Sequence, residues 1–382
     1  MNYKVTALTP LLVGDGRALS PIDYMVWKDQ VNVLDQPTIF KSLRNSRLFD
    51  TYLGELRTAR KLDFARWGGY AQQERFSRRR IPFENADSTA AWNAAPPESL
   101  FIPTFTTDYR GAYLPASAVK GALRTGLVFS RWSAATMERL AASVEGDRLP
   151  RRASEAAEAA VSASQVRIVS LADSQPVPAS AFRVYVTRVA SLDTRQAGKP
   201  QLVWKVTGRG SVPPQRIADA TPLFTEMATP GTSFHGGWQQ HKFLDRQEAM
   251  RALGWRSAPQ TETLTEAANQ YAAAQLNLHA RYAEATGLQG LRQTLEHLQR
   301  ELSAAQAAPL TCLLSLGWGS GFLSKAAFLD TENESYRKIL RSVPAIGKAM
   351  RDGVTFPKTR RVVFAGGQPS SLPGWVRLEF VK

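Results

Sequence analysis

The stretch LPASAVKGALRTGL, residues 114–127, predicts the helix around which the rest of this fold is arranged. Pro115 and Ser117 suit the first turn of a helix, where proline lacks only an amide proton that has no partner there. Val119 and Leu123 lie four residues apart, so their side chains fall on one face and begin an apolar stripe. We therefore expect an amphipathic helix with one face in the core.

The other face of this helix is a candidate binding surface. Lys120 and Arg124 are also four residues apart, so both cations point the same way. Gly121 between them thins the helix surface and lets another backbone come close. Together with Ser117 the pair is interpreted as a phosphate clamp, and a solvated face without a ligand is the alternative.

Strands are expected on both sides of this helix. Residues 3–13 form an opening strand that ends in a turn at Gly14-Asp15-Gly16, because glycine permits the backbone angles of tight turns. β-Branched content and alternation predict further strands at residues 24–27, 31–34, 166–171, 182–189, 201–206, 221–227, 232–238 and 374–380. We expect 201–206 to extend a sheet that contains 166–171 and 182–189.

These elements indicate an α+β chain with a single core over residues 1–382 and large, partly helical insertions. Residues 46–99 are rich in arginine and aromatic side chains and indicate a basic insertion, and residues 134–163 indicate a helical one. Residues 239–310 are helical, with a stripe of four leucines between 291 and 302 that is typical of core packing. Residues 311–382 hold a glycine-rich loop and the closing strand.

Charge gives the first indication of function. The chain has 48 lysines and arginines against 33 acidic residues, a formal charge of +15 and a pI of about 10.1. Such an excess favours a polyanionic partner, either nucleic acid or an anionic membrane surface. No apolar run approaches the roughly 20 residues that span a bilayer, and the N-terminus lacks the pattern of a signal peptide. We therefore expect a nucleic-acid partner, no membrane and a cytoplasmic location.

The sharpest local signal is the loop Gly317-Trp318-Gly319-Ser320-Gly321. Glycines at alternate positions let backbone N–H groups approach a phosphate closely. Ser320 and Ser324 add hydroxyl donors, Lys325 adds charge, and Trp318 offers a face for a stacked base. The spacing fits neither a Walker loop nor a dinucleotide fingerprint, and a tight structural turn is the alternative.

Two basic clusters complete the set of candidate RNA-binding residues. They are Arg78, Arg79 and Arg80 beside Arg75 and Phe76, and Lys358, Arg360 and Arg361. The first mixes cations with an aromatic ring and suits a flexible loop or hairpin that holds phosphates. For both clusters, a solvated run of charges is the alternative.

The sequence offers little for catalysis. Asp15 and Asp23 follow the first strand, where a metal-assisted ribonuclease could place a carboxylate, but neither has an evident partner. The four histidines show no metal-binding spacing, and the single cysteine, Cys312, excludes a disulfide or a multi-thiolate zinc site within the chain. We expect no catalytic residue, no metal and no cofactor.

Four segments together resemble the RAMP proteins of CRISPR systems. They are the opening strand and turn (residues 5–16, followed by 19–24), the helix start LPASAVKGALR (114–124), the strand end VSLADSQP (169–176) and the loop LGWGSGFLSK (316–325). The helix start is similar to the family's (I/L)PGSS(L/I)KGA(L/I)R, with Ala116 and Ala118 in place of glycine and serine. With residues 357–361 and 374–378, the order and spacing are most similar to the fifth Csm subunit of type III-A effector complexes.

The resemblance implies an RRM-like, or ferredoxin-like, β-α-β-β-α-β core, with the Lys120 helix as its first helix and residues 376–380 as its last strand. It implies a subunit that caps the 3′ end of the guide RNA (crRNA) and stacks on a neighbouring Csm backbone subunit, but is not the nuclease. Lys120, Arg124 and the Gly317–Gly321 loop would contact the guide backbone irrespective of sequence, because phosphate contacts position RNA without specifying it. The partners implied are crRNA, target RNA, and the backbone and small subunits of the complex, in crRNA maturation and antiviral defence.

Three alternatives stay open. The chain is a RAMP endoribonuclease that cuts through a loop aspartate or a histidine, another backbone subunit of a type III complex, or a basic scaffold that touches only protein. Loss of cutting on substitution of Asp15 or Asp23 would favour the first. A lack of salt-sensitive RNA binding would favour the last.

Overall fold

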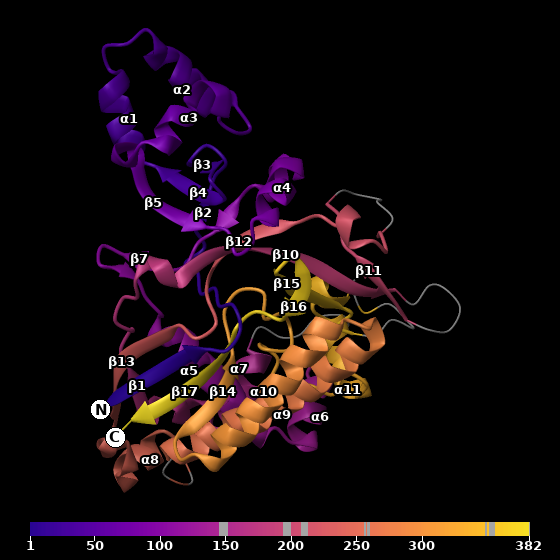
Figure 1. The fold of residues 1–382 in the computed structure, drawn as a ribbon. Helices are drawn as coiled ribbons and strands as arrows, with labels where there is room; N and C mark the ends of the chain where they lie inside the picture. The colour runs from indigo at the N-terminus through magenta and orange to yellow at the C-terminus, as the bar shows by residue number, and fades with distance from the viewer. Residues whose placement is uncertain are drawn as a thin grey trace.

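The first β-sheet joins strands from both ends of the chain. The computed structural model describes residues 1–144, 152–193, 200–207, 213–255, 257, 260–347, 350 and 356–381. The sheet has the order β14-β17-β1-β13-β9, and every neighbouring pair is antiparallel. Its strands are β1 (Asn2–Ala7), β9 (Val169–Leu171), β13 (Ser233–Gln240), β14 (Thr311–Ser315) and β17 (Trp375–Val381). Because Asn2 pairs with Val381, the two ends of the chain lie side by side (Figure 1).

Apart from the edge strand β14, this sheet has the strand order of a ferredoxin-like fold. Taken along the chain, β1, β9, β13 and β17 are the first to fourth strands, and in the sheet they lie in the order 4-1-3-2. Helix α5 (Ala116–Arg131) connects the first strand to the second, and its Val119, Leu123 and Leu127 pack on the sheet in one buried cluster. The predicted α+β, RRM-like core is therefore confirmed, with the Lys120 helix as its first helix.

A second sheet is built around one long strand. Strand β10 (Phe182–Asp193) pairs with β11 (Gln201–Trp204) and β12 (Leu223–Ala228) on one side and with β15 (Thr359–Ala365) on the other, and β16 (Gln368–Ser371) completes the sheet. The prediction that residues 166–171 and 182–189 share one sheet is wrong. Residues 163–168 form a 3-10 helix, and β9 joins the first sheet while β10 founds the second.

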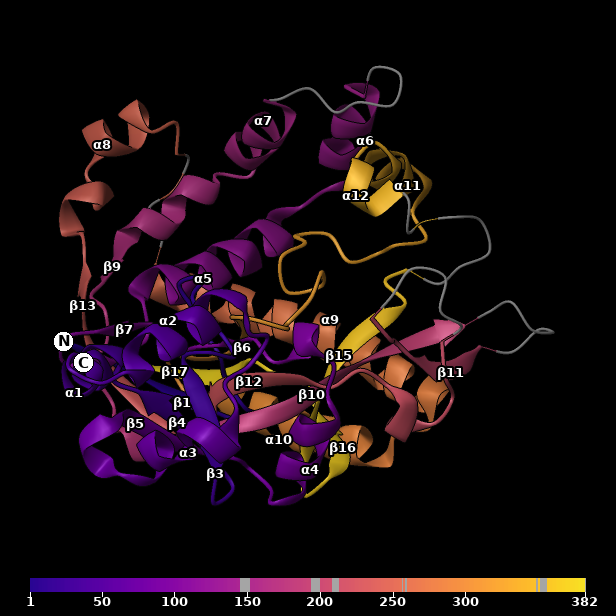
Figure 2. The ribbon, with the colours of Figure 1, turned by 90° about the horizontal axis from the view of Figure 1, so that it is seen from above.

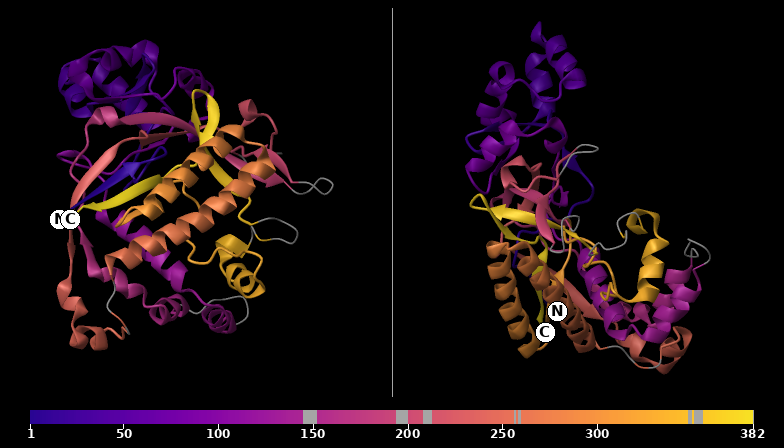
Figure 3. Two further views of the ribbon diagram at one scale, coloured as in Figure 1. Left: turned by 60° about the horizontal axis from the view of Figure 1, so that its bottom comes forward. Right: turned by 90° about the vertical axis from the view of Figure 1, so that its right-hand side faces the viewer.

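Two long helices, α9 (Thr261–Thr286) and α10 (Gln289–Ala307), pack together along one side of the molecule (Figure 3). The amide of Asn269 on α9 closes the free edge of β14: its Nδ2 donates to Thr311 O at 2.9 Å, and its Oδ1 accepts from Leu313 N at 3.0 Å. The leucine stripe of α10 is buried in the second hydrophobic cluster, as its spacing predicts.

A small module stands apart above the two sheets (Figure 1). It contains the antiparallel strands β3 (Tyr24–Trp27), β4 (Gln30–Leu34) and β5 (Ser77–Pro82), with helices α1 (Gln36–Leu43), α2 (Leu48–Thr58) and α3 (Phe64–Gln72) around a core of their own. The expected flexible loop or hairpin at Arg78-Arg79-Arg80 is wrong, because these arginines lie in strand β5, which pairs with β4 through Arg79 and Arg80. The module therefore begins earlier than the insertion expected at residue 46, since β5 needs β3 and β4 to complete its sheet.

The remaining elements are short and lie around this framework. They are α4 (Asp87–Ala94), α6 (Ala134–Ala142), α7 (Ala153–Ala160), α8 (Gln247–Ala252), α11 (Glu334–Arg341), α12 (Pro344–Gly347), β2 (Ala18–Leu19), β6 (Ile102–Pro103), β7 (Thr107–Asp108) and β8 (Gly111–Ala112). Seen from above, α6, α7, α11 and α12 gather on the side away from the small module (Figure 2). Within the described residues, no helix has the length and apolar character needed to cross a bilayer.

Candidate nucleic-acid interface

Two of the segments singled out in the sequence meet at the start of α5. The carboxylate of Asp173 accepts a hydrogen bond from the N–H of Ala116 at 2.7 Å, and the hydroxyl of Ser174 accepts from the N–H of Leu114 at 2.9 Å. A carboxylate at a helix N-terminus satisfies free N–H groups and the positive end of the helix dipole. The Asp-Ser pair therefore fixes where α5 begins, and it occupies the place that a phosphate would otherwise take.

The cations of α5 lie on its exposed side, one turn further on. Ser117 and Arg124 are exposed and Lys120 is partly buried. Burial and repulsion from Arg167 lower the pKa of Lys120, so a third cation stands close by. Arg124 pairs with Glu158 of α7 across a surface contact. The spacing in the sequence predicts that Lys120 and Arg124 lie on one side of the helix. It does not predict Arg167, which lies in the 3-10 helix before β9.

The glycine-rich loop follows β14 and packs tightly on the core. A Cβ on Gly317 would stand 2.4 Å from Leu12 O, and one on Gly319 would stand 2.8 Å from Cγ of Pro373. Both glycines also have φ near +80°, in the left-handed region. The Trp318 N–H donates to Leu12 O at 2.7 Å. At these two positions glycine is required by the packing of the protein itself.

The two serines of this loop are turned inward. The hydroxyl of Ser320 donates to Gly317 O at 2.8 Å, and that of Ser324 lies 2.7 Å from Ser320 Oγ and 3.0 Å from Gly321 O. Both side chains are buried. The expectation that these hydroxyls serve as free donors to a ligand is wrong, because they hold the turn closed.

Arg361 of β15 covers one face of the loop's aromatic ring. Its guanidinium carbon lies 3.9 Å from the centroid of Trp318, a cation–π contact. A base cannot stack on that face while the arginine is there. Nε of Arg361 is buried and has no hydrogen-bond partner among the described residues.

Arg360, its neighbour in β15, is held from three directions. Its Nε donates to Nδ1 of His279 at 3.1 Å, and its Nη1 donates to Pro357 O at 2.8 Å and to Thr359 O at 2.9 Å. Burial lowers the pKa of Arg360 to about 10, so the side chain stays charged at neutral pH. Burial and this cation lower the pKa of His279 well below its usual range, so the imidazole is neutral and accepts the bond.

The loop and β15 together line a cavity of about 460 Å³, which we call the loop cavity. Four cations reach it from three segments: Lys205, Lys325, Arg360 and Arg361. None of its described lining residues is acidic. A pocket with several cations, exposed glycine backbone and no carboxylate suits an anionic ligand. Two predicted clusters thus meet here, and Lys205 joins them from the end of β11 without any signal in the sequence.

Helix α5 and the loop cavity are neighbours through α9. The ring of Phe129 on α5 lies 5.1 Å from that of Tyr271, whose hydroxyl donates to the carbonyl groups of Leu323 and Ala326 just after the loop. Phe129 lies nine residues beyond Lys120, or about 13 Å along a helix. The C-terminal end of α5 is therefore connected to the segment after the loop, and Lys120 and Arg124 lie further back along the same helix.

The arginines of β5 are not part of this region. Arg79 forms an ion pair with the fully buried Glu226 at 2.5 Å and ties the small module to the second sheet. Arg80 makes a weak contact with Glu74 at 3.4 Å, while Arg78 is exposed. The three adjacent arginines therefore have different surroundings, and the guanidinium of Arg79 is used in an ion pair within the protein.

The groups considered for catalysis lie apart from one another. Asp15 forms a surface ion pair with Arg17, and Asp23 accepts from the N–H of Ser20 at 2.7 Å within a turn. Among the described residues no three His, Cys, Asp or Glu side chains gather as a metal site. Cys312 is buried, and burial raises its pKa.

Comparison with known proteins identifies the family to which the chain belongs. The family model of the RAMP superfamily matches residues 4–211, slightly more than half of the chain. A search of curated protein sequences found no match.

Two solved structures share the fold over nearly their whole length. One is a chain of a cryo-EM structure described as a Csm–crRNA–target RNA ternary complex of a type III-A CRISPR-Cas system; it has a TM-score of 0.63 and 19% identity, over 99% of this chain and 100% of that one. The other is the crystal structure of Csm5 from T. onnurineus, with a TM-score of 0.56 and 20% identity, over 98% and 99% of the two chains.

Proposed function

The chain belongs to the RAMP superfamily, and from that premise we propose that it is a non-catalytic, crRNA-binding subunit that caps the 3′ end of the guide in a type III-A CRISPR (Csm) complex. In this role it would support crRNA maturation and assembly of the complex with backbone and small subunits. The similarity of the whole chain to Csm5 and to a chain of a Csm–crRNA–target RNA complex supports the choice within the superfamily.

The observation that carries the proposal is the loop cavity. Lys205, Lys325, Arg360 and Arg361 face it, with no acidic residue among its described lining residues. A single-stranded RNA backbone carries one negative charge per nucleotide, and cations in a groove bind it without reading sequence. Lys120, Arg124 and Arg167 extend the basic region along α5. We expect guide phosphates to run over both.

A co-purification experiment tests this function. The tagged chain would be expressed with Csm-type subunits and a repeat–spacer array, and the RNA that co-purifies would be sequenced. We expect short guide RNAs with a repeat-derived 5′ tag, together with the other subunits. Purification of the chain alone, or without such RNA, would contradict the proposal.

A paired charge reversal locates the interface in the same experiment. Lys120→Glu/Arg124→Glu should lose the 3′-proximal part of the guide or the full-length assembly. The matched control is Lys242→Glu/Arg246→Glu, which changes the net charge equally at two exposed positions near α8. Equal losses in the two variants would show that only overall charge matters.

Cutting by this chain is the second candidate function, and incubation with guide precursor and with target RNA tests it. We expect no cleavage by the purified chain. Cleavage that disappears in Asp15→Asn or Asp23→Asn, with assembly intact, would make the ribonuclease reading the correct one.

A further inference from the structure

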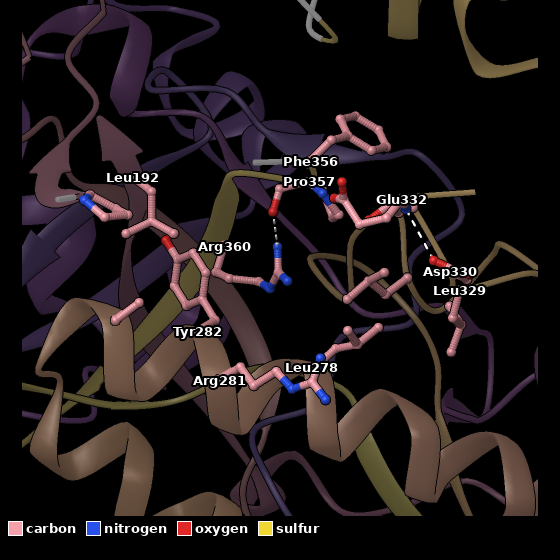
Figure 4. A pocket seen from close by; sticks show the side chains of 14 residues that line it. Leu192, Leu278, Arg281, Tyr282, Leu329, Asp330, Glu332, Phe356, Pro357 and Arg360 are labelled. Atoms are coloured by element: carbon pink, nitrogen blue, oxygen red, sulfur yellow. Dashed lines mark hydrogen bonds between the residues drawn. The ribbon is translucent and has the colours of Figure 1, made fainter. Parts of the chain in front are cut away.

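Figure 4 shows a second cavity, of about 510 Å³. Its walls are mostly apolar, from Leu192, Leu278, Leu329 and Phe356, with the ring of Tyr282 on one side. We call it the Tyr282 cavity. Its size falls within the range of about 300–1,000 Å³ that is typical of small-molecule sites.

The two cavities are continuous at one side chain. Leu323, Pro357 and Arg360 line both of them. Figure 4 shows the Arg360 side chain reaching between Pro357 and Tyr282. A ligand bound at the four cations of the loop cavity therefore has the Tyr282 cavity directly beside it.

Arg360 is fixed at this junction and keeps donors free. Nε and Nη1 are used by His279, Pro357 and Thr359, and its guanidinium carbon lies 4.6 Å from the centroid of Tyr282. An arginine has five N–H donors, and the two on Nη2 have no acceptor among the described residues. These two hydrogens are available to a ligand at the point where the cavities join.

The charges of the two cavities differ, and the difference indicates what each accepts. The loop cavity has no acidic lining residue among those described, whereas Asp330 and Glu332 line the Tyr282 cavity together with Arg281. Two carboxylates disfavour a phosphate. Apolar walls with donors and acceptors at the rim suit a flat, uncharged ring with polar edges, which describes a nucleobase.

We propose that the Tyr282 cavity receives one unpaired nucleobase of the RNA whose phosphates occupy the loop cavity, with Arg360 between base and backbone. The inference rests on the proposed function, because it needs RNA at the loop cavity. Bases of single-stranded RNA are free to turn out of the stack and enter such a pocket. The bound nucleotide would be held by its shape and its position at the junction.

Two short ligands distinguish the contribution of the bases to binding from that of the backbone phosphates. One is an RNA hexanucleotide, and the other is a hexamer of abasic tetrahydrofuran phosphates, which has the same backbone charge and no bases. Binding of each to the full-length chain would be measured by fluorescence anisotropy at low salt. We expect the RNA to bind about tenfold more tightly, within the range that one stacked base contributes.

Tryptophan substitutions then fill the Tyr282 cavity without touching the loop cavity. Ala285 is exposed and lines only the former of the two, so Ala285→Trp should fold normally. It should remove most of the advantage of RNA over the abasic hexamer and leave binding of the abasic hexamer within about twofold. Leu278→Trp fills the same cavity from one side and should behave alike. Ala280→Trp adds the same bulk on the same helix outside both cavities and is the matched control.

Each outcome has a distinct meaning. Equal binding of RNA and abasic hexamer to the unmodified chain, or an RNA advantage that survives both Ala285→Trp and Leu278→Trp, would overturn the base site while the proposed function stands. Binding of neither ligand would overturn the proposed function and the base site with it. Loss confined to Ala285→Trp and Leu278→Trp, with Ala280→Trp unchanged, supports the proposal.

Discussion

Arg360 and Arg361 are adjacent in β15 and line the same cavity, yet their surroundings differ. Arg360 is fixed by His279 and two backbone carbonyl groups, whereas Arg361 lies flat on Trp318 and has a buried Nε without a described partner. A planar guanidinium holds five N–H donors in a rigid fork and lies flat on an aromatic ring, whereas the ammonium group of lysine is a compact point charge. Arg360 is therefore held by hydrogen bonds to the protein, whereas Arg361 is held by its contact with Trp318 and keeps a buried donor without a described partner.

The first residue-scale prediction concerns His279 and pH. Its pKa in the folded state lies well below the usual value of about 6.5. As pH falls below about 6.5, the unfolded chain takes up a proton at this residue that the folded chain does not, so the free energy of unfolding decreases. The decrease is up to about 1.4 kcal/mol per pH unit. His279→Asn keeps an acceptor for Arg360 and should reduce this dependence, as measured by urea denaturation between about pH 5 and about pH 7.5. If the free energy of unfolding changed equally with pH in the unmodified chain and in His279→Asn, the prediction would be wrong.

The second residue-scale prediction compares two glycines of the loop. Gly317 and Gly321 both have φ near +80°, so alanine at either should cost about 1 kcal/mol. A Cβ at Gly317 would also stand 2.4 Å from Leu12 O, whereas a Cβ at Gly321 would meet nothing within 4 Å. Gly317→Ala should therefore lower the free energy of unfolding by about 1–3 kcal/mol more than Gly321→Ala. Chemical denaturation of the two variants would measure this difference in the free energy of unfolding. Equal losses of stability would contradict the prediction and mean that the loop shifts to accommodate the Cβ at Gly317.

At this scale the sequence shows which residues are unusual but not which way they face. Alternating glycines, the tryptophan and the following Lys325 predict a special loop, and the structure has one. The inward turn of Ser320 and Ser324 depends on the Leu12 segment against which the loop packs, more than 300 residues earlier. Arg167, Lys205 and His279 join the interface through tertiary packing alone, so spacing gives no sign of them. Whether the predicted residues contact RNA stays a prediction.

At the scale of elements, the local sequence pattern predicts whether a segment is a helix or a strand, and long-range pairing decides which sheet a strand joins. Strands at residues 24–27 and 31–34, the helix around Lys120 and the leucine stripe of α10 all follow from periodicity. The division into two sheets does not, because β10 pairs with β15, about 170 residues later. The small module likewise depends on pairing between β4 and β5, which α1, α2 and α3 separate in the chain.

The ion pair between Arg79 and Glu226 connects this module to the second sheet, and it gives the element-scale prediction. Removal of one partner leaves a buried charge alone, which costs about 3–5 kcal/mol. Arg79→Met should therefore destabilise the chain strongly, and Arg79→Met/Glu226→Leu should recover much of the loss. The neighbouring Arg78→Met is the control, because Arg78 is exposed. Thermal denaturation and limited proteolysis of the module would measure the effect, and a neutral Arg79→Met would refute the proposed connection.

At the scale of the whole molecule, the net charge and the fold both favour RNA as the partner. The chain carries a formal charge of +15, and cations from the loop, β15 and the end of β11 come together in the loop cavity. Each phosphate contact in single-stranded RNA contributes about −0.7 to the slope of log K against log salt.

The whole-molecule prediction is a change in this salt dependence. Lys120→Glu/Arg124→Glu should reduce the slope for RNA binding by about 1.4, if each cation meets one phosphate. Glu158→Gln releases Arg124 from its ion pair and should leave the slope unchanged or steeper. Anisotropy titrations at several salt concentrations measure both. An unchanged slope in the double variant would remove α5 from the interface.

Cross-linking from the 3′ end of the guide RNA would show directly whether this chain caps that end. A guide RNA with 4-thiouridine at its 3′-terminal nucleotide would be assembled into the complex, irradiated, and the cross-linked peptides of this chain identified by mass spectrometry. We expect cross-links to the Gly317–Gly321 loop or to the β15 segment around Arg360 and Arg361. Cross-links from the 3′ end that fall wholly on other subunits, or cross-links of this chain to the 5′ tag instead, would contradict it.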